Sequence, residues 1–193
     1  SRDWSSDVCS SDLQKQVTSI KVGARPRGIG FLPDGGRAYV AGEEANSVYS
    51  IDTAKQSVLR TIKAGVRANG IAVRPDGKRV FVSNGEGTVM AIDTANDAVI
   101  ATIRVGQRPW NMAITPDGKK LYVANGRSNS VSVIDTREAR IIDTVPVGQR
   151  PWNMAITPDG KKLYVANGRS GTVSVIDAQA GRKLRDEIGR AHV

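Results

Sequence analysis

The residues best suited to bind a charged ligand are arginines and tryptophans that recur along the chain. An arginine precedes a similar stretch four times, at Arg25, Arg67, Arg108 and Arg150. A guanidinium group beside an indole ring can hold an anionic or aromatic group through charge and stacking. The pattern therefore predicts a ligand-binding surface, with these residues as its candidates: Arg108, Trp110, Arg127, Arg150, Trp152 and Arg169.

The same recurrence also allows a purely structural interpretation. Each arginine could hydrogen-bond loop carbonyls between neighbouring segments, and each tryptophan could fill the gap between them. Arginine stands at the same place in all four segments, which favours the structural role. Tryptophan occurs only twice, at Trp110 and Trp152, while the counterparts are Arg27 and Asn69. That variation favours binding, so both interpretations stay open.

Little in the chain indicates nucleophilic or metal chemistry. A single Cys and a single His are too few for a disulfide framework or a Cys/His metal site. No GxSxG or P-loop pattern occurs. An aspartate that follows isoleucine once per segment is typical of turn capping, and these residues are Asp52, Asp93, Asp135 and Asp177. We therefore assign no catalytic residue, no metal ligand and no cofactor.

A repeat of 41 or 42 residues organises these positions. Pro-Asp-Gly occurs at 33–35, 75–77, 116–118 and 158–160, and the 24 residues 105–128 return unchanged at 147–170. Periods of this length are typical of propellers and helical arrays. The chain is therefore built from four similar units.

Each unit has the pattern of four short strands. In the third unit, residues 111–115 alternate, Pro-Asp-Gly supplies a turn, and residues 121–124, 130–134 and 141–147 are further strand candidates. No window has the apolar spacing of a helix. In the first strand of each unit, one face carries large apolar residues and the other carries a small one. The small residues, which suit a crowded strand near a central axis, are Gly30, Ala72, Ala113 and Ala155. We therefore predict an all-β fold, a β-propeller of about four four-stranded antiparallel blades, with a β-sandwich as the alternative.

The predicted blades occupy residues 14–186, in repeats near 17–57, 58–98, 99–140 and 141–183. Residues 1–13 and 187–193 fit no repeat and resemble translated sequencing adapters, so we interpret them as non-native. Residues 17–22 have the pattern of the fourth strand of a preceding blade, and residues 182–186 begin another fourth strand. We expect an open partial ring from a larger propeller, whose unburied faces would make the isolated chain self-associate.

The second strand of each unit carries a family signature. Residues 122–125 and 164–167 both read Tyr-Val-Ala-Asn, residues 81–84 are a close variant, and residues 39–42 depart at the last position. Residues 14–186 therefore resemble the YVTN-type β-propeller repeat family. The resemblance implies a propeller of about seven blades, from bacteria or archaea, in the periplasm or at the cell surface. Some relatives accompany quinone-dependent oxidation systems, and others are similar to sugar lactonases.

These observations favour a non-enzymatic binding or scaffold propeller, whose partner is an unknown protein or a small anionic ligand. The alternative is the blade region of a lactonase-like or quinone-linked, oxidation-associated propeller. The formal charge of +9 also allows weak nucleic-acid binding through the Arg/Trp loops. No stretch of the sequence is long and apolar enough to span a membrane.

Overall fold

Sixteen strands in four sheets form the regular structure of residues 16–188, the part of the chain that the computed structural model describes. Every sheet has four antiparallel strands joined in chain order, which confirms the predicted all-β propeller fold. The strands are β1 (Pro26–Phe31), β2 (Arg37–Gly42), β3 (Ser47–Asp52) and β4 (Ser57–Lys63) in blade 1; β5 (Ala68–Val73), β6 (Arg79–Asn84), β7 (Thr88–Asp93) and β8 (Ala98–Arg104) in blade 2; β9 (Pro109–Ile114), β10 (Lys120–Asn125), β11 (Ser130–Asp135) and β12 (Arg140–Pro146) in blade 3; β13 (Pro151–Ile156), β14 (Lys162–Asn167), β15 (Thr172–Asp177) and β16 (Arg182–Ile188) in blade 4.

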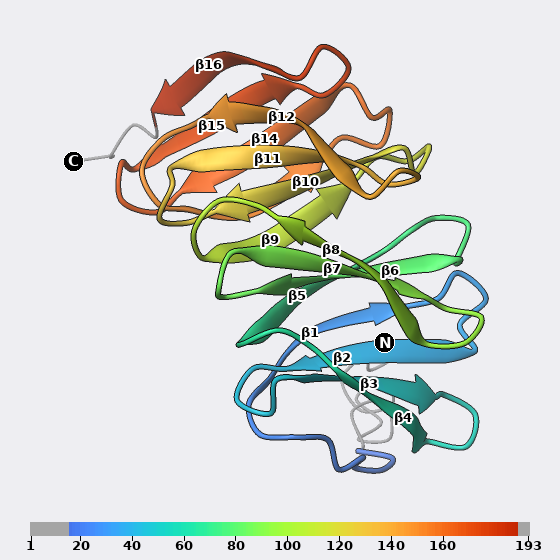
Figure 1. Cartoon of the computed structure of the whole chain (residues 1–193). Helices are drawn as coiled ribbons and strands as arrows, with labels where there is room; N and C mark the ends of the chain where they lie inside the picture. Colours follow the sequence, from blue (N-terminus) through green and yellow to red (C-terminus); the bar gives the residue numbers. More distant parts are fainter. Residues whose placement is uncertain (1–15, 189–193) are drawn as a thin grey trace, which may run out of the picture.

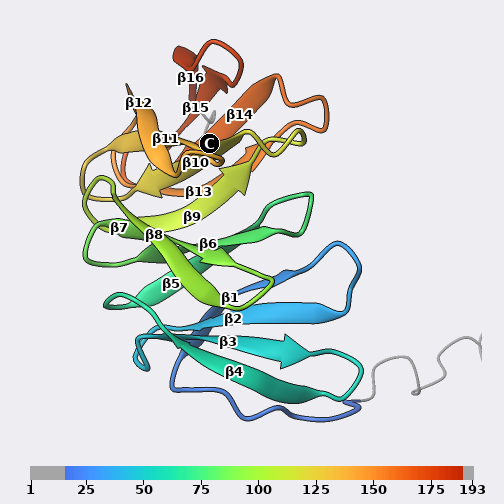
Figure 2. The same ribbon diagram turned by 45° about the vertical axis from the view of Figure 1, so that its right-hand side comes forward.

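The four sheets follow one another in space as they do in the sequence, from blue to red in Figures 1 and 2. The first strands of consecutive blades lie next to each other, β1 against β5, β5 against β9 and β9 against β13. These first strands are therefore the innermost ones, as the small residues predicted to face a crowded centre require. No helix long and apolar enough to cross a membrane occurs within residues 16–188.

The turns are built by the side chains that the sequence places in them. In blade 3, the amide of Gly118 donates to the carbonyl of Thr115 at 2.8 Å, and Gly118 has a φ of 69°, which favours glycine. The carboxylate of Asp117 accepts from the amide of Lys119 at 3.0 Å. The Thr115 hydroxyl and this amide hold the pKa of Asp117 below its usual range. Asp135 likewise accepts from the amide of Arg137 at 2.8 Å, so the predicted turn-capping role is confirmed there.

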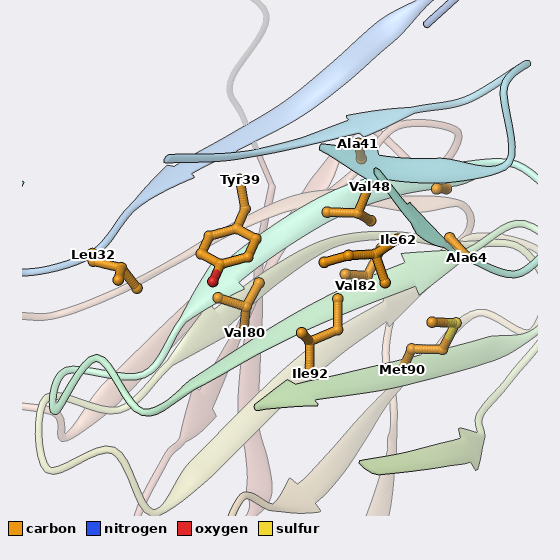
Figure 3. Packing of buried hydrophobic residues seen from close by; sticks show 11 residues of the cluster. Leu32, Tyr39, Ala41, Val48, Ile62, Ala64, Val80, Val82, Met90 and Ile92 are labelled. Carbon is orange, nitrogen blue, oxygen red and sulfur yellow. The ribbon is translucent and has the colours of Figure 1, made fainter. Parts of the chain in front are cut away.

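The apolar core lies between blades rather than within them. Figure 3 shows the contact between blades 1 and 2, where Tyr39, Val48 and Ile62 pack against Val80 and Ile92. Equivalent clusters join blade 2 to blade 3 and blade 3 to blade 4. Each blade is therefore sealed by its neighbours, as expected for a repeat protein with nearest-neighbour contacts.

Polar contacts join the same blade faces. The hydroxyl of Tyr39 in blade 1 donates to the carboxylate of Asp97 in blade 2 at 2.6 Å. The hydroxyl of Tyr122 in blade 3 donates to the carbonyl of Ala178 in blade 4 at 2.6 Å. Burial raises the pKa of both tyrosines, to about 12 for Tyr122. The second-strand tyrosines of blades 1 and 3 therefore anchor the turn of the following blade.

One predicted strand is absent. Residues 17–22 have no regular secondary structure, because they pair with none of the described strands. The side chains of Ile20 and Val22 nevertheless pack against Ala38, Val40 and Ile51 of blade 1. The apolar pattern of this segment therefore determined its packing, whereas strand structure also needs a hydrogen-bonding partner.

The predicted repeats and the observed sheets are offset by one strand. The sheets span residues 26–63, 68–104, 109–146 and 151–188, whereas the predicted repeats begin with the outer strand of the preceding blade. Residues 1–13, predicted to be non-native, lie outside the described residues. Of the second such segment, 187–193, only residues 187 and 188 are described, and they end β16.

Candidate anion-binding site

The four recurrent arginines lie in the loops that enter the innermost strands. Arg25, Arg67, Arg108 and Arg150 all have a positive φ, between 54° and 60°. The carbonyl of Arg108 accepts from the amide of Gly126 at 3.0 Å, and that of Arg150 accepts from the amide of Gly168 at 2.9 Å. This loop and the loop after the second strand therefore share one face of the blade.

The loops use the backbone of these arginines. The amide of Arg150 donates to Oδ1 of Asn129 at 2.9 Å, and that of Arg67 donates to Oδ1 of Asn46 at 2.8 Å. Glycine or asparagine adopts this left-handed conformation at lower cost than arginine. Within residues 16–188, none of the four recurrent guanidinium groups donates to a loop carbonyl. The structural interpretation of the arginine side chains is therefore not supported.

The two tryptophans differ in their surroundings. Trp110 is 8% exposed and Trp152 is 44% exposed, and their ring centroids are 4.3 Å apart. The Trp110 ring is packed so closely against Gly126 that an added Cβ there would lie 2.7 Å from it. Trp110 therefore fills the space between blades 3 and 4, as the structural interpretation expects, whereas Trp152 is nearly half exposed beside the innermost strands.

The loops of the four blades carry opposite charges at one equivalent position, which we name the loop-charge position. It holds Glu44, Glu86, Arg127 and Arg169 in blades 1 to 4. In blade 1, Arg25 forms ion pairs with Glu43 at 3.2 Å and Glu44 at 3.4 Å. In blades 3 and 4 the recurrent arginine has a second arginine in place of the glutamate. No carboxylate of the described residues forms an ion pair with these four arginines, Arg108, Arg127, Arg150 and Arg169.

These four arginines are among the residues that line one cavity of about 250 Å³ between blades 3 and 4, which we name the arginine pocket. Its remaining lining residues are Trp110, Gly126, Asn129 and Gln149. Five of the six candidate residues thus come together here. The sixth, Trp152, lies beyond Trp110 and lines a neighbouring cavity of about 330 Å³ by the innermost strands.

Two polar residues of the arginine pocket were missed in the sequence. Asn129 has a φ of 51°, and its carbonyl accepts from the amide of Val147 at 3.0 Å. The amide of Gln149 donates to the hydroxyl of Ser170 at 3.1 Å. Both residues resemble ordinary loop residues in the sequence, and only the approach of two blades turns them toward a shared cavity.

The electrostatics of the arginine pocket are set by like charges. The guanidinium carbon of Arg108 lies 4.8 Å from the centroid of the Trp110 ring. Partial desolvation, followed by the charges of Arg127 and Arg150, lowers the pKa of Arg108 below its usual value. Arginine nevertheless stays protonated in proteins. The pocket is therefore a cationic site in which a bound anion would relieve repulsion between the arginines.

The chemistry available to the arginine pocket is binding and orientation. Guanidinium groups donate hydrogen bonds in a planar fork that matches carboxylate and phosphate oxygens. They supply no general base, because they do not lose their proton. Within residues 16–188, no cluster of three or more His, Cys, Asp or Glu residues could hold a metal ion.

Comparison with known proteins agrees with this fold. The family model described as "Lactonase, 7-bladed beta-propeller" matches residues 6–141 and 111–189. No curated protein matches the chain. Hydrazine synthase from Kuenenia stuttgartiensis is 30% identical, with a TM-score of 0.80 over 91% of this chain and 52% of the hydrazine synthase chain. A functionally unknown protein from Desulfotomaculum acetoxidans is 22% identical, with a TM-score of 0.75 over 86% of this chain and 57% of its own.

The chain thus spans about half the length of these two solved proteins. The matches support the β-propeller part of the predicted family, while the assignment to the YVTN type stays a prediction. Because the matched segments together cover nearly the whole sequence, the chain belongs to the family of seven-bladed lactonase-type β-propellers.

Proposed function

We propose that this propeller binds a small anionic ligand in the arginine pocket. The observation that carries the proposal is the lining of the cavity, which includes four arginines and no acidic residue. A cation cluster of this kind is unfavourable unless solvent or a ligand supplies negative charge. Charge-assisted hydrogen bonds from guanidinium groups are about twice as strong as neutral ones, so an anion gains affinity here.

The position of the pocket supports a binding role over a structural one. Its arginine side chains take no part in the turns, which use backbone atoms, and the buried Trp110 also lines the cavity. The ligand-binding residues that we propose are the six candidates of the sequence, with Trp152 contributing to the neighbouring cavity. A cavity of about 250 Å³ lies just below the usual range for drug-sized ligands, which favours a small molecule.

Isothermal titration calorimetry of the full chain with glutarate and pyrophosphate tests this proposal. We expect binding that weakens at least tenfold in the double variant Arg127→Glu/Arg169→Glu. The matched control is Arg137→Glu, which changes the charge in an exposed turn on the opposite loop face. Absence of binding by the unmodified chain, or equal losses in the pocket and control variants, would contradict the proposal.

A second candidate function is hydrolysis of a lactone, which the match to the lactonase family favours. Lactone hydrolysis produces a hydroxy acid, and the arginine pocket would hold its carboxylate. Groups that activate water would then come from elsewhere in the propeller, because none of the side chains that line the pocket is a general base. Release of acid from a panel of aldonolactones, followed at constant pH, tests this candidate. A rate equal to the uncatalysed one would remove this candidate.

The cellular location is a further part of the proposal. The resemblance to YVTN-type propellers supports a place in the periplasm or at the cell surface. Fractionation of cells that produce the protein tests it, and recovery of the protein with the cytoplasmic contents would contradict it.

A further inference from the structure

We infer that the arginine pocket selects compact multivalent anions, which carry two or more anionic groups, and that the loop-charge position decides which blades bind. This inference rests on the proposed function and adds to it a ligand class and a rule for specificity. The class comprises oligocarboxylates and oligophosphates, which present the same chemistry to guanidinium groups.

The loop-charge position is a natural control within one molecule. In all four blades, the residue before it donates its amide to the carbonyl of the recurrent arginine, at distances between 2.9 and 3.1 Å. This backbone contact is therefore shared by the four blades, whereas the charge at the loop-charge position differs. The loops also differ in two other ways, since blade 1 carries Glu43 where the others have glycine and the loop of blade 2 is one residue shorter. Glutamate in blade 1 neutralises Arg25 at 3.4 Å, whereas arginine in blades 3 and 4 doubles the positive charge. The choice of residue at this position therefore places the anion site between the last two blades.

The cationic groups are divided between two blades. Arg108 and Arg127 come from blade 3, and Arg150 and Arg169 come from blade 4. Asn129 of blade 3 links the loops of the two blades, since its Oδ1 accepts from the amide of Arg150 at 2.9 Å. Its side-chain NH2 group has no partner among the described residues, so it is a further donor at the cavity lined by all five side chains. A ligand held by the whole set therefore bridges the two blades.

The number of guanidinium groups indicates the valence of the ligand. One carboxylate accepts at most two bidentate partners comfortably, and it would leave the other blade's arginines in mutual repulsion. A second anionic group gains its own charge-assisted hydrogen bonds at little extra cost, because the ligand is already immobilised. The cavity volume of about 250 Å³ requires these groups to be close together. A short di- or trianion satisfies both requirements.

Calorimetry with butyrate, glutarate and tricarballylate, which carry one, two and three carboxylates, tests the valence at constant ionic strength. We expect the dissociation constant to fall at least tenfold from butyrate to glutarate and further for tricarballylate. Orthophosphate and pyrophosphate are titrated in parallel. The preferred class of anion is the one, carboxylate or phosphate, whose multivalent ligand binds more tightly. If all members of both classes bind equally, the inference is wrong and the proposed function stands. If none binds, the proposed function is wrong.

Variants at the loop-charge position test the rule for specificity. Arg127→Glu and Arg169→Glu each give one blade the Gly-Glu pattern of blade 2, and we expect each to reduce the preference for glutarate over butyrate at least fivefold. Glu86→Arg should instead strengthen binding of multivalent anions at the edge of blade 2. The control Arg137→Glu should change neither. Circular dichroism and thermal unfolding show whether each variant is folded, and an unchanged valence preference in folded Arg127→Glu and Arg169→Glu variants would overturn the rule.

Discussion

Blades 3 and 4 contain the same 24 residues, 105–128 and 147–170, in two different environments. Tyr122 is fully buried, whereas its copy Tyr164 is 39% exposed. Trp110 is likewise buried, whereas its copy Trp152 is largely exposed. The reason is position in the fan of sheets, since blade 4 covers one face of blade 3 while no described residue covers the same face of blade 4 (Figure 1). Identical sequence therefore gives identical strands but unequal burial.

The local structure of the two copies is the same. Ala113 pairs with Tyr122 in blade 3, and Ala155 pairs with Tyr164 in blade 4. Leu121 and Leu163, which belong to the opposite face of the strand, are both fully buried. Strand pairing and turns are thus decided within the repeat, while burial of one face is decided by the next blade. The following predictions test how much stability that neighbour contributes.

The largest difference is expected for truncation of the two tyrosines. Tyr122→Ala removes a buried ring and should lower the free energy of unfolding by about 3–5 kcal/mol. Tyr164→Ala should cost only about 1 kcal/mol, because much of that ring is already in contact with water. Urea denaturation of both variants measures the difference. Equal costs would mean that blade 4 does not cover blade 3 as described.

Truncation of the two leucines tests the opposite face of the same blades, which packs against the preceding blade. Leu121→Ala and Leu163→Ala should each cost about 2–5 kcal/mol, and the two values should agree within about 1 kcal/mol. Both side chains face a preceding blade that is present. A much smaller cost for Leu163→Ala in the same urea experiment would show that blade 4 is loosely packed.

Removal of one hydroxyl tests the polar part of the contact. Tyr122→Phe loses the hydrogen bond to Ala178 and should cost about 0.5–1.5 kcal/mol. Phenylalanine is tolerated at this position, since Phe81 occupies it in blade 2. Thermal unfolding at neutral pH measures the loss. A variant as stable as the unmodified chain would contradict a contribution from this bond.

The same hydroxyl predicts a pH dependence. Desolvation, followed by the charges of nearby aspartates, raises the pKa of Tyr122 to about 12, while an unfolded tyrosine titrates near 10. The folded state therefore holds this proton more tightly, and the resulting stability is complete below about pH 10 and is lost as the pH rises through about 12. Tyr39, whose pKa is also raised, contributes with the same sign. Between pH 9 and 11.5, the free energy of unfolding from urea denaturation should decrease less steeply with pH in Tyr122→Phe than in the unmodified chain. An equal decrease in both proteins would contradict this assignment.

The smallest effect on stability is expected from the free blade faces. Exposed apolar residues occur on both terminal blades, among them Ile29 and Phe31 on blade 1 and Trp152 and Tyr164 on blade 4. We expect the chain to self-associate through them. Tyr164→Lys should lower the free energy of unfolding by no more than the value of about 1 kcal/mol expected for Tyr164→Ala but reduce association in sedimentation velocity. A compact monomer at all concentrations of the unmodified chain would contradict this expectation.

Much of the fold follows from local sequence, as particular residues demonstrate. Pro-Asp-Gly builds its turns through Gly118 and Asp117, and the alternation of large and small residues in β9 orients Met112 toward blade 2 and Ala113 toward blade 4. Residues 17–22 are an exception, since they form no strand. Their apolar pattern was correct for packing and wrong for strand structure, since a pattern does not supply a pairing partner.

The candidate site was predictable in its parts but not in its organisation. The sequence indicated which loops carry the arginines and tryptophans. It did not reveal that Arg108 and Arg150 serve the turns through their backbone, nor that Asn129 joins the two blades. These relations depend on distances between loops about 21 residues apart, which a repeat pattern does not encode.

By itself, the sequence determined the strands and turns of the four described blades, because these depend on side chains within one repeat. The tertiary structure alone decided that Trp110 is buried while Trp152 is exposed, and that four guanidinium groups share one cavity. The physical reason is that burial and charge clustering are properties of contacts between blades. Two copies of one sequence differ in them as soon as their neighbours differ.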